Sequence, residues 1–91
     1  MAAIHIEREH TLGKNGAREA VEDVASQMKQ RLDVSYNWNG DTLQFQRSGA
    51  NGTIAVGDTT VTVDVDLGLT LSAFKRPIEQ QIREYLDQRL G

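Results

Sequence analysis

The sequence predicts an α+β fold, in which one antiparallel β-sheet carries two helices on one of its faces. Two segments repeat apolar residues at helical spacing, and five others alternate apolar with polar residues, as half-buried strands do. Short Gly-containing breaks separate the last four alternating segments, which is typical of hairpins rather than long crossovers. The expected element order is β-α-β-β-β-β-α.

The first strand and the first helix are predicted near the start of the chain. Ile4 and Ile6 alternate with polar residues, which indicates a short strand. A helix over about 13–32 follows, with basic residues in its last turn, where the helix dipole favours positive charge. Its apolar stripe consists of Ala17, Val21, Val24, Ala25, Met28 and Leu32.

Four strands are predicted between residues 34 and 67. In each, the apolar residues occupy every second position, or one parity, and so share one face of the sheet. The breaks at Asn39-Gly40, Asn51-Gly52 and Gly57-Asp58 are assigned to turns. None of these glycines opens a helix, so they are interpreted as turn residues and not as a phosphate-binding loop. The inward parities are Val34, Tyr36 and Trp38; Leu43, Phe45 and Arg47; Ile54 and Val56; and Val61, Val63, Val65 and Leu67.

The closing helix is predicted to start between Ser72 and Arg76 and to end at about Leu90. Pro77 fits within its first turn, where the missing N–H has no partner in the helix. The apolar stripe steps by four through Phe74, Ile78, Ile82, Leu86 and Leu90.

These elements fit one domain over residues 1–91. A helical crossover makes the first two strands parallel, and the meander then lets strand one pair antiparallel with strand five. The predicted strand order is therefore 1-5-4-3-2, a small helix-grip-like arrangement. Tyr36, Trp38 and Phe45 share the inward parity and are expected to pack in the core, not to stack on bases.

Composition narrows the function classes. Thirteen acidic against ten basic residues give a net charge of −3, which argues against nucleic-acid binding. The absence of cysteine excludes disulfides and thiolate metal sites. The start, "MAAIHIEREH", lacks the features of a signal peptide, and no segment approaches membrane-spanning length. We expect a soluble cytoplasmic protein.

Catalytic and cofactor motifs are missing. Ser48 and Ser72 are placed at a turn and a helix start, where serine has ordinary hydrogen-bonding roles. A non-enzymatic protein without a cofactor is expected. A weak metal or acid–base candidate is the patch formed by His5, Asp64 and Asp66 with Glu7, if strands one and five pair; a solvated sheet face explains the same residues more simply.

The segment "LGLTLSAFKR" is the most suggestive stretch, with Leu69, Leu71 and Phe74 followed by Lys75 and Arg76. Cations at a helix start oppose the dipole and need another reason to be there. They could form an anion site, or they could help the apolar residues dock on a granule or lipid surface. The simpler structural reading is that the leucines finish strand five and Phe74 begins the helix stripe.

Three blocks, "IHIEREHTLG", "YNWNGDTLQFQRSGANGTIAV" and "VTVDVDLGLTLSAFKRPIEQQIREYLDQRLG", together resemble the small polyhydroxyalkanoic acid system proteins. The most specific part is "GDTLQFQRSG" followed by "GTI" and then "LGLTLSAFK". The resemblance covers nearly the whole chain. It implies a bacterial cytoplasmic protein associated with polyhydroxyalkanoate storage granules, and it supplies no catalytic residue.

Two function hypotheses follow. The first is an accessory protein that binds the granule surface or another granule protein. The alternative is a small module that holds a hydroxyacyl or fatty-acyl group between sheet and helices, although Tyr36, Trp38 and Phe45 are expected to leave little cavity. An enzyme that uses the His5 patch is a more distant third.

The outward face of the sheet is expected to be polar and lightly charged. Because its edges are open, a homodimer and a monomer are both compatible with the sequence. The outward residues are Ser35, Asn37, Asn39, Thr42, Gln44, Gln46, Thr53, Thr60 and Thr62.

Overall fold

A computed structural model describes residues 2–90 and has the predicted element order, with one additional short helix. Before the meander come β1 (Ala2–Glu9) and α1 (Gly13–Leu32). The meander consists of β2 (Ser35–Asn39), β3 (Thr42–Arg47), β4 (Ala50–Val56) and β5 (Thr60–Leu67). The chain closes with α2 (Leu69–Ser72) and α3 (Lys75–Leu90). The predicted bounds of both long helices are confirmed, and Pro77 lies in the first turn of α3.

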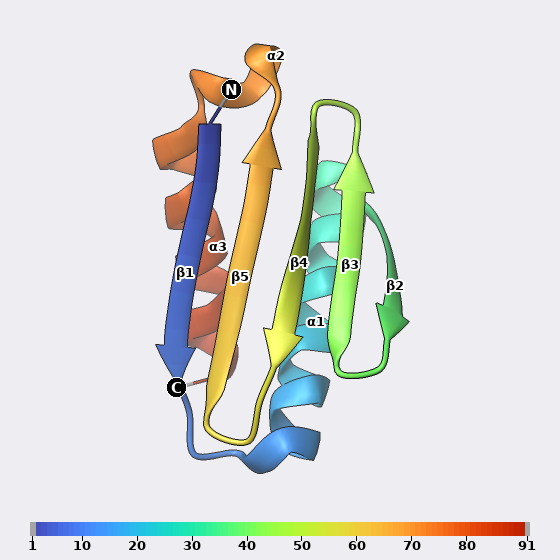
Figure 1. Cartoon of the computed structure of the whole chain (residues 1–91), viewed down its shortest axis with the longest axis vertical. Coiled ribbons are helices and arrows are strands. Elements are labelled where there is room, and N and C mark those ends of the chain that lie inside the picture. The colour runs from blue at the N-terminus through green and yellow to red at the C-terminus, as the bar shows by residue number, and fades with distance from the viewer. Residues whose placement is uncertain (1, 91) are drawn as a thin grey trace.

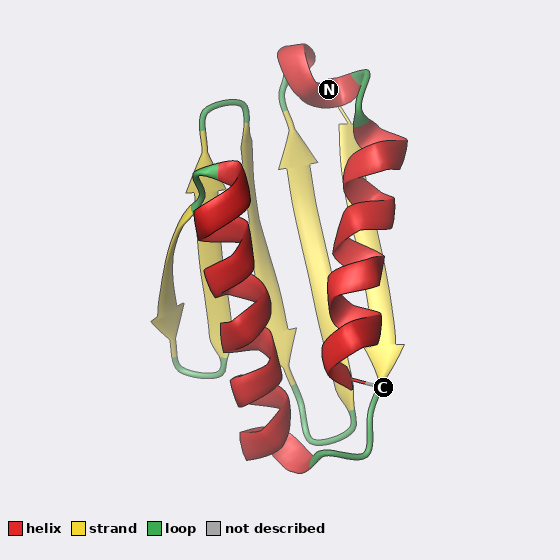
Figure 2. Cartoon of the chain, turned by 180° about the vertical axis from the view of Figure 1, so that it is seen from behind, coloured by secondary structure: helices red, strands yellow, loops and turns green. Residues whose placement is uncertain are grey.

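The sheet has the order β1-β5-β4-β3-β2, and all neighbouring strands are antiparallel, as predicted. Helices α1 and α3 lie on the same face of the sheet, and the other face carries no helix (Figures 1 and 2). The register aligns the inward residues, since Ile54 pairs with Leu43 on one side and Val63 on the other. One apolar sheet face is thereby continuous from strand to strand.

The core lies between that sheet face and the two helices. Side chains from both layers are almost completely buried there, among them Ile4 and Ile6 of β1, Val21 of α1 and Leu86 of α3. The inward-facing side chains of the strands are buried, and for this reason the alternation of apolar and polar residues identified the strands correctly.

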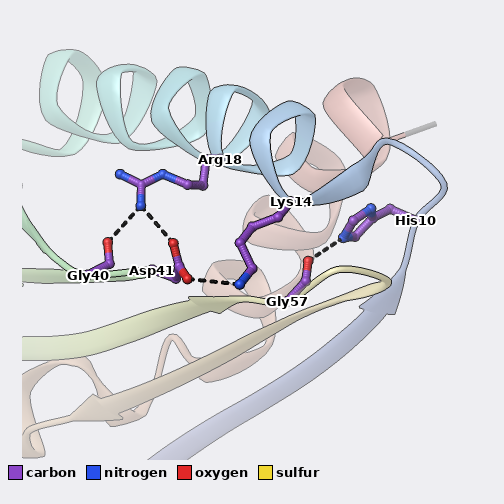
Figure 3. A network of polar contacts seen from close by, with 6 residues as sticks. All are labelled: His10, Lys14, Arg18, Gly40, Asp41 and Gly57. Carbon is purple, nitrogen blue, oxygen red and sulfur yellow. Dashed lines mark hydrogen bonds and ion pairs between the residues drawn. The ribbon is translucent and has the colours of Figure 1, made fainter.

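An ion-pair network joins the first half of α1 to the β2–β3 turn (Figure 3). Arg18 donates to the Asp41 carboxylate and to the Gly40 carbonyl, both at 2.8 Å, and Lys14 lies 3.1 Å from Asp41. These two cations, Arg18 first and Lys14 second, lower the pKa of Asp41 below its ordinary value. The network fixes the position of α1 against the turn.

His10 joins the segment after β1 to the β4–β5 loop (Figure 3), and its side chain is buried. Its Nε2–H donates to the Gly57 carbonyl at 3.1 Å, while Nδ1 accepts from the Leu12 N–H at 3.2 Å. These two bonds require the neutral Nε2–H tautomer. Both ring nitrogens are therefore occupied by structural contacts.

The prediction of a turn at Asn51-Gly52 is wrong. The chain reverses three residues earlier, at Ser48-Gly49, where Gly49 has a φ of 86°. Gly52 lies inside β4, opposite Phe45. A Cβ there would lie 2.7 Å from the Phe45 ring and 2.4 Å from the Asp64 carbonyl oxygen. Glycine occupies this position because the aromatic ring covers the strand, and β4 consequently begins well before the predicted run at Ile54.

Tyr36 and Trp38 face α1, as predicted, but they pack at its polar side. The Tyr36 hydroxyl and the Trp38 Nε1–H both donate to the Glu22 carboxylate, the latter at 2.8 Å. The guanidinium of Arg18 lies 4.4 Å from the centre of the Trp38 ring, a cation–π contact. Two of the three aromatic residues thus cover the edge of the sheet and leave the space between α1 and α3 to other side chains.

Candidate functional site

The segment that follows β5 leaves the sheet at Gly68. Leu67 pairs with Ala2 and Ala50, the first residues of β1 and β4, so strand pairing ends there. The N–H groups of Leu71 and Ser72 then donate to the Gly68 carbonyl, which closes the single turn of α2. The expectation that Leu69 and Leu71 finish strand five is therefore wrong.

Residues 69–76, here called the docking segment, present apolar side chains to solvent. Leu69 is 83% exposed and Phe74 is 54% exposed, whereas Leu71 is half-buried against the core. Phe74 does not begin the buried stripe of α3, because the fully buried residues of that helix start at Ile82. Among residues 2–90, Leu12 is the only other large hydrophobic side chain that is exposed.

Lys75 and Arg76 form the first turn of α3 and are exposed beside Phe74. Neither forms an ion pair with any residue that the structure describes; the nearby carboxylate of Glu79 pairs with Arg83 at 3.2 Å. Four of the five residues predicted for a contact surface, Leu69, Phe74, Lys75 and Arg76, therefore lie exposed in one segment. Leu71 turns inward.

Leu71 and Phe74 also lie at the edge of an apolar cavity of about 410 Å³. It opens between the end of α1, the start of α3 and the sheet, and of its fourteen lining residues only Arg47 and Gln81 are polar. The expectation that aromatic residues leave little cavity is wrong, because Tyr36 and Trp38 are not among that lining. The lining is Met28, Leu32, Val34, Phe45, Arg47, Ala50, Val65, Leu67, Leu71, Phe74, Pro77, Ile78, Gln81 and Ile82.

Arg47 is the functional candidate that sequence reasoning passed over. The sequence does contain a signal, because Arg47 is a charged residue at a position of β3 where Leu43 and Phe45 set an apolar pattern. The exposed side chain donates from Nη1 to the Leu32 carbonyl at 3.1 Å and from Nε to the Ser48 carbonyl at 3.2 Å. Arg47 lines both the apolar cavity and a polar surface hollow next to it, and it forms no ion pair within residues 2–90.

The predicted pairing of the first and fifth strands is present, and it sets His5 opposite Asp64 with 2.5 Å between Nδ1 and Oδ1. The Asp64 carboxylate, through this hydrogen bond and its charge, raises the pKa of His5 above its ordinary value. Asp66 lies opposite Ala3, and Glu7 opposite Thr62. Within the described chain, no three His, Cys, Asp or Glu residues are grouped as a metal site requires.

Neither long helix has the apolar character needed to cross a membrane, and this holds for every helix between residues 2 and 90.

Comparison with known proteins gives one family. No curated protein and no solved structure matches the chain. The model of the family described as "Putative polyhydroxyalkanoic acid system protein" matches residues 4–90, which include the whole docking segment and every residue that lines the cavity. The chain therefore belongs to this family of polyhydroxyalkanoic acid system proteins.

Proposed function

We propose that the protein is a non-enzymatic accessory protein of bacterial polyhydroxyalkanoate storage, which associates in the cytoplasm with the granule surface or with a granule protein. The observation that carries the proposal is the exposure of Leu69 and Phe74 directly beside Lys75 and Arg76, two cations that form no ion pair with the residues between 2 and 90. The family description supports the link to polyhydroxyalkanoate.

The position of the docking segment suits contact with a large surface. α2 and the start of α3 lie at one end of the elongated molecule, beyond the strands (Figure 1). Covering a fully exposed leucine or phenylalanine contributes about 1.5–3 kcal/mol. The two cations can reach anionic groups around an apolar contact, an attraction that salt screens over about 8–10 Å.

A binding role is favoured over catalysis by the state of the reactive side chains. His10 uses both ring nitrogens for backbone contacts, and the Ser72 hydroxyl donates to the Leu69 carbonyl at 3.0 Å. The exposed His5 pairs with a carboxylate on an open sheet face. The proposal accordingly assigns no catalytic residue.

Co-sedimentation with isolated granules tests the proposal. Lys75→Glu with Arg76→Glu, and separately Leu69→Ser with Phe74→Ser, should reduce the bound fraction at least several-fold. Lys29→Glu with Arg89→Glu is the matched control, because it makes the same charge change at two exposed residues outside the docking segment that form no ion pair within residues 2–90. Exposed charge reversals should change the free energy of unfolding by only about 0.5 kcal/mol.

Granules with and without their native protein coat separate the two partners. Binding to coated granules alone identifies a granule protein as the partner, whereas equal binding to both identifies the polymer or lipid surface. Unchanged binding of both docking-segment variants contradicts the proposal.

A second candidate function rests on a separate observation, the apolar cavity between the sheet and the two helices. It favours a module that holds a hydroxyacyl or fatty-acyl group, in addition to surface association. Thermal unfolding in the presence of soluble acyl ligands tests this function, because a ligand that binds the folded state raises the melting temperature.

A further inference from the structure

We propose that the cavity binds one aliphatic carboxylic acid, with its chain between α1 and α3 and its carboxylate at Arg47. This inference rests on the second candidate function and adds the ligand class, its orientation and the residue that recognises it. It does not depend on granule association.

The lining dictates an aliphatic chain. A cavity of about 410 Å³ falls within the usual range for ligand pockets, roughly 300–1,000 Å³. Apart from Arg47 and Gln81 it offers no polar side chain, so a ligand with several buried polar groups would leave them unpaired. Figure 2 shows α1 and α3 further apart at the end of the molecule that carries α2, and the cavity lies there.

The volume limits the length of the chain. At roughly 30 Å³ for each chain atom, the share of one water molecule in the liquid, the volume sets an upper bound of about 13 chain atoms, because the cavity is open to solvent on one side. Two chains would not fit.

Arg47 places the carboxylate at the mouth. Its guanidinium always carries a positive charge and offers five N–H donors. One donor on Nε and one on Nη1 already donate to backbone carbonyl oxygens. The remaining donors match a carboxylate, whose two oxygens accept paired N–H bonds. Asp33 and Asp66 line the polar hollow beside Arg47, so Arg47 is the one side chain in the two linings whose charge attracts an anion.

A chain-length series tests the binding of the chain. The ligands are hexanoate, octanoate and decanoate, each used below its micelle concentration. Their Kd should fall along the series by about fourfold for each added methylene. The methyl signal of Met28, which lines the cavity, should shift in NMR spectra on titration. Ala50→Leu, which adds volume to the lining, should weaken decanoate binding at least tenfold and leave the fold intact.

Arg47→Gln tests the orientation. It should weaken decanoate binding about five- to tenfold, because an exposed charged hydrogen bond is partly screened. Arg89→Gln, on the exposed side of α3, is the control and should bind like the unmodified protein. 1-Decanol, which lacks the charge, should be insensitive to Arg47→Gln.

The outcomes separate the two levels of the inference. No shift of Met28 with millimolar decanoate overturns both the ligand-binding function and the assignment of the ligand. Decanoate binding that is unaffected by Arg47→Gln, or equal affinity for 1-decanol, overturns only the carboxylate site. The Lys75→Glu and Arg76→Glu variant should bind uncharged 1-decanol as the unmodified protein does, which separates ligand binding from granule association.

Discussion

His5 and Asp64 meet on the outward face of the sheet, and their contact predicts a measurable titration. The carboxylate hydrogen bond raises the pKa of His5, so folding gains stability from this pair while His5 is protonated. That contribution is complete below the ordinary histidine pKa and is lost as the pH rises through the raised pKa. In an NMR titration, Asp64→Asn should return the pKa of His5 toward its ordinary value. An identical pKa in both proteins would show that the pair does not form.

Gly52 is the residue at which a clash can be predicted most directly. Gly52→Ala would place a Cβ 2.4 Å from the Asp64 carbonyl oxygen and 2.7 Å from the Phe45 ring, and should destabilise the fold by about 1–3 kcal/mol. Gly68→Ala is the control, since its nearest neighbour would lie 3.4 Å away. Urea unfolding measures both variants. Equal stability of the two would contradict the close packing of Phe45 over β4.

Single residues also show where sequence reasoning reaches its limit. Asn-Gly is typical of hairpin turns, and both Ser48-Gly49 and Asn51-Gly52 are available within four residues of each other. The choice between them depends on the register of β3 against β4, and therefore on where the Phe45 ring lies. A local pattern contains no information about a ring on the neighbouring strand.

The first helix ends in a conformation that its own sequence disfavours. Asp33 follows α1 with a φ of 58°, in the left-handed region, where glycine is preferred. Asp33→Gly should therefore increase the free energy of unfolding by about 0.5–1 kcal/mol. Urea unfolding checks this, with Asp23→Gly inside the helix as a control that should lower the free energy of unfolding by about 0.3 kcal/mol, the difference in helix propensity between aspartate and glycine. A loss of stability on Asp33→Gly would show that the aspartate side chain contributes more than the backbone costs.

The long elements were predictable because their patterns repeat. The apolar stripe of α1 runs from Ala17 to Leu32, about four turns, and β5 alternates inward and outward residues along all its eight positions. α2 was not predictable, because one helical turn provides no periodicity to detect. The alternation of Leu67, Leu69 and Leu71 continued the strand pattern beyond the point at which β5 has neighbours to pair with.

The whole sheet order followed from one crossover and a meander of hairpins, which leave few arrangements open. The cavity could not be predicted from the sequence, because it depends on the distance between α1 and α3. That distance is decided by side-chain packing along both helices, and sequence periodicity describes each helix alone. Arg47 was recognisable as a strand residue, but its place at the cavity mouth required the positions of both helices.

Truncating one side chain just before α3 and one within it tests whether the docking segment contributes little to the stability of the fold. Phe74→Ala should lower the free energy of unfolding by less than about 1 kcal/mol, since the side chain is more than half exposed. Ile82→Ala removes a side chain that is only 3% exposed and should cost about 2–5 kcal/mol. Thermal unfolding compares the two. A large loss for Phe74→Ala would mean that Phe74 belongs to the core and would remove it from the docking segment.

The central claim is that the docking segment is the part of the molecule that meets the granule. The chain contains no cysteine, so Leu69→Cys and Asn37→Cys each accept one polarity-sensitive dye. Leu69 lies in the docking segment, and Asn37 is exposed on the outward face of the sheet. On addition of isolated granules, the dye at position 69 should shift its emission to the blue while the dye at position 37 does not change. A shift at position 37 without one at position 69 would contradict the claim.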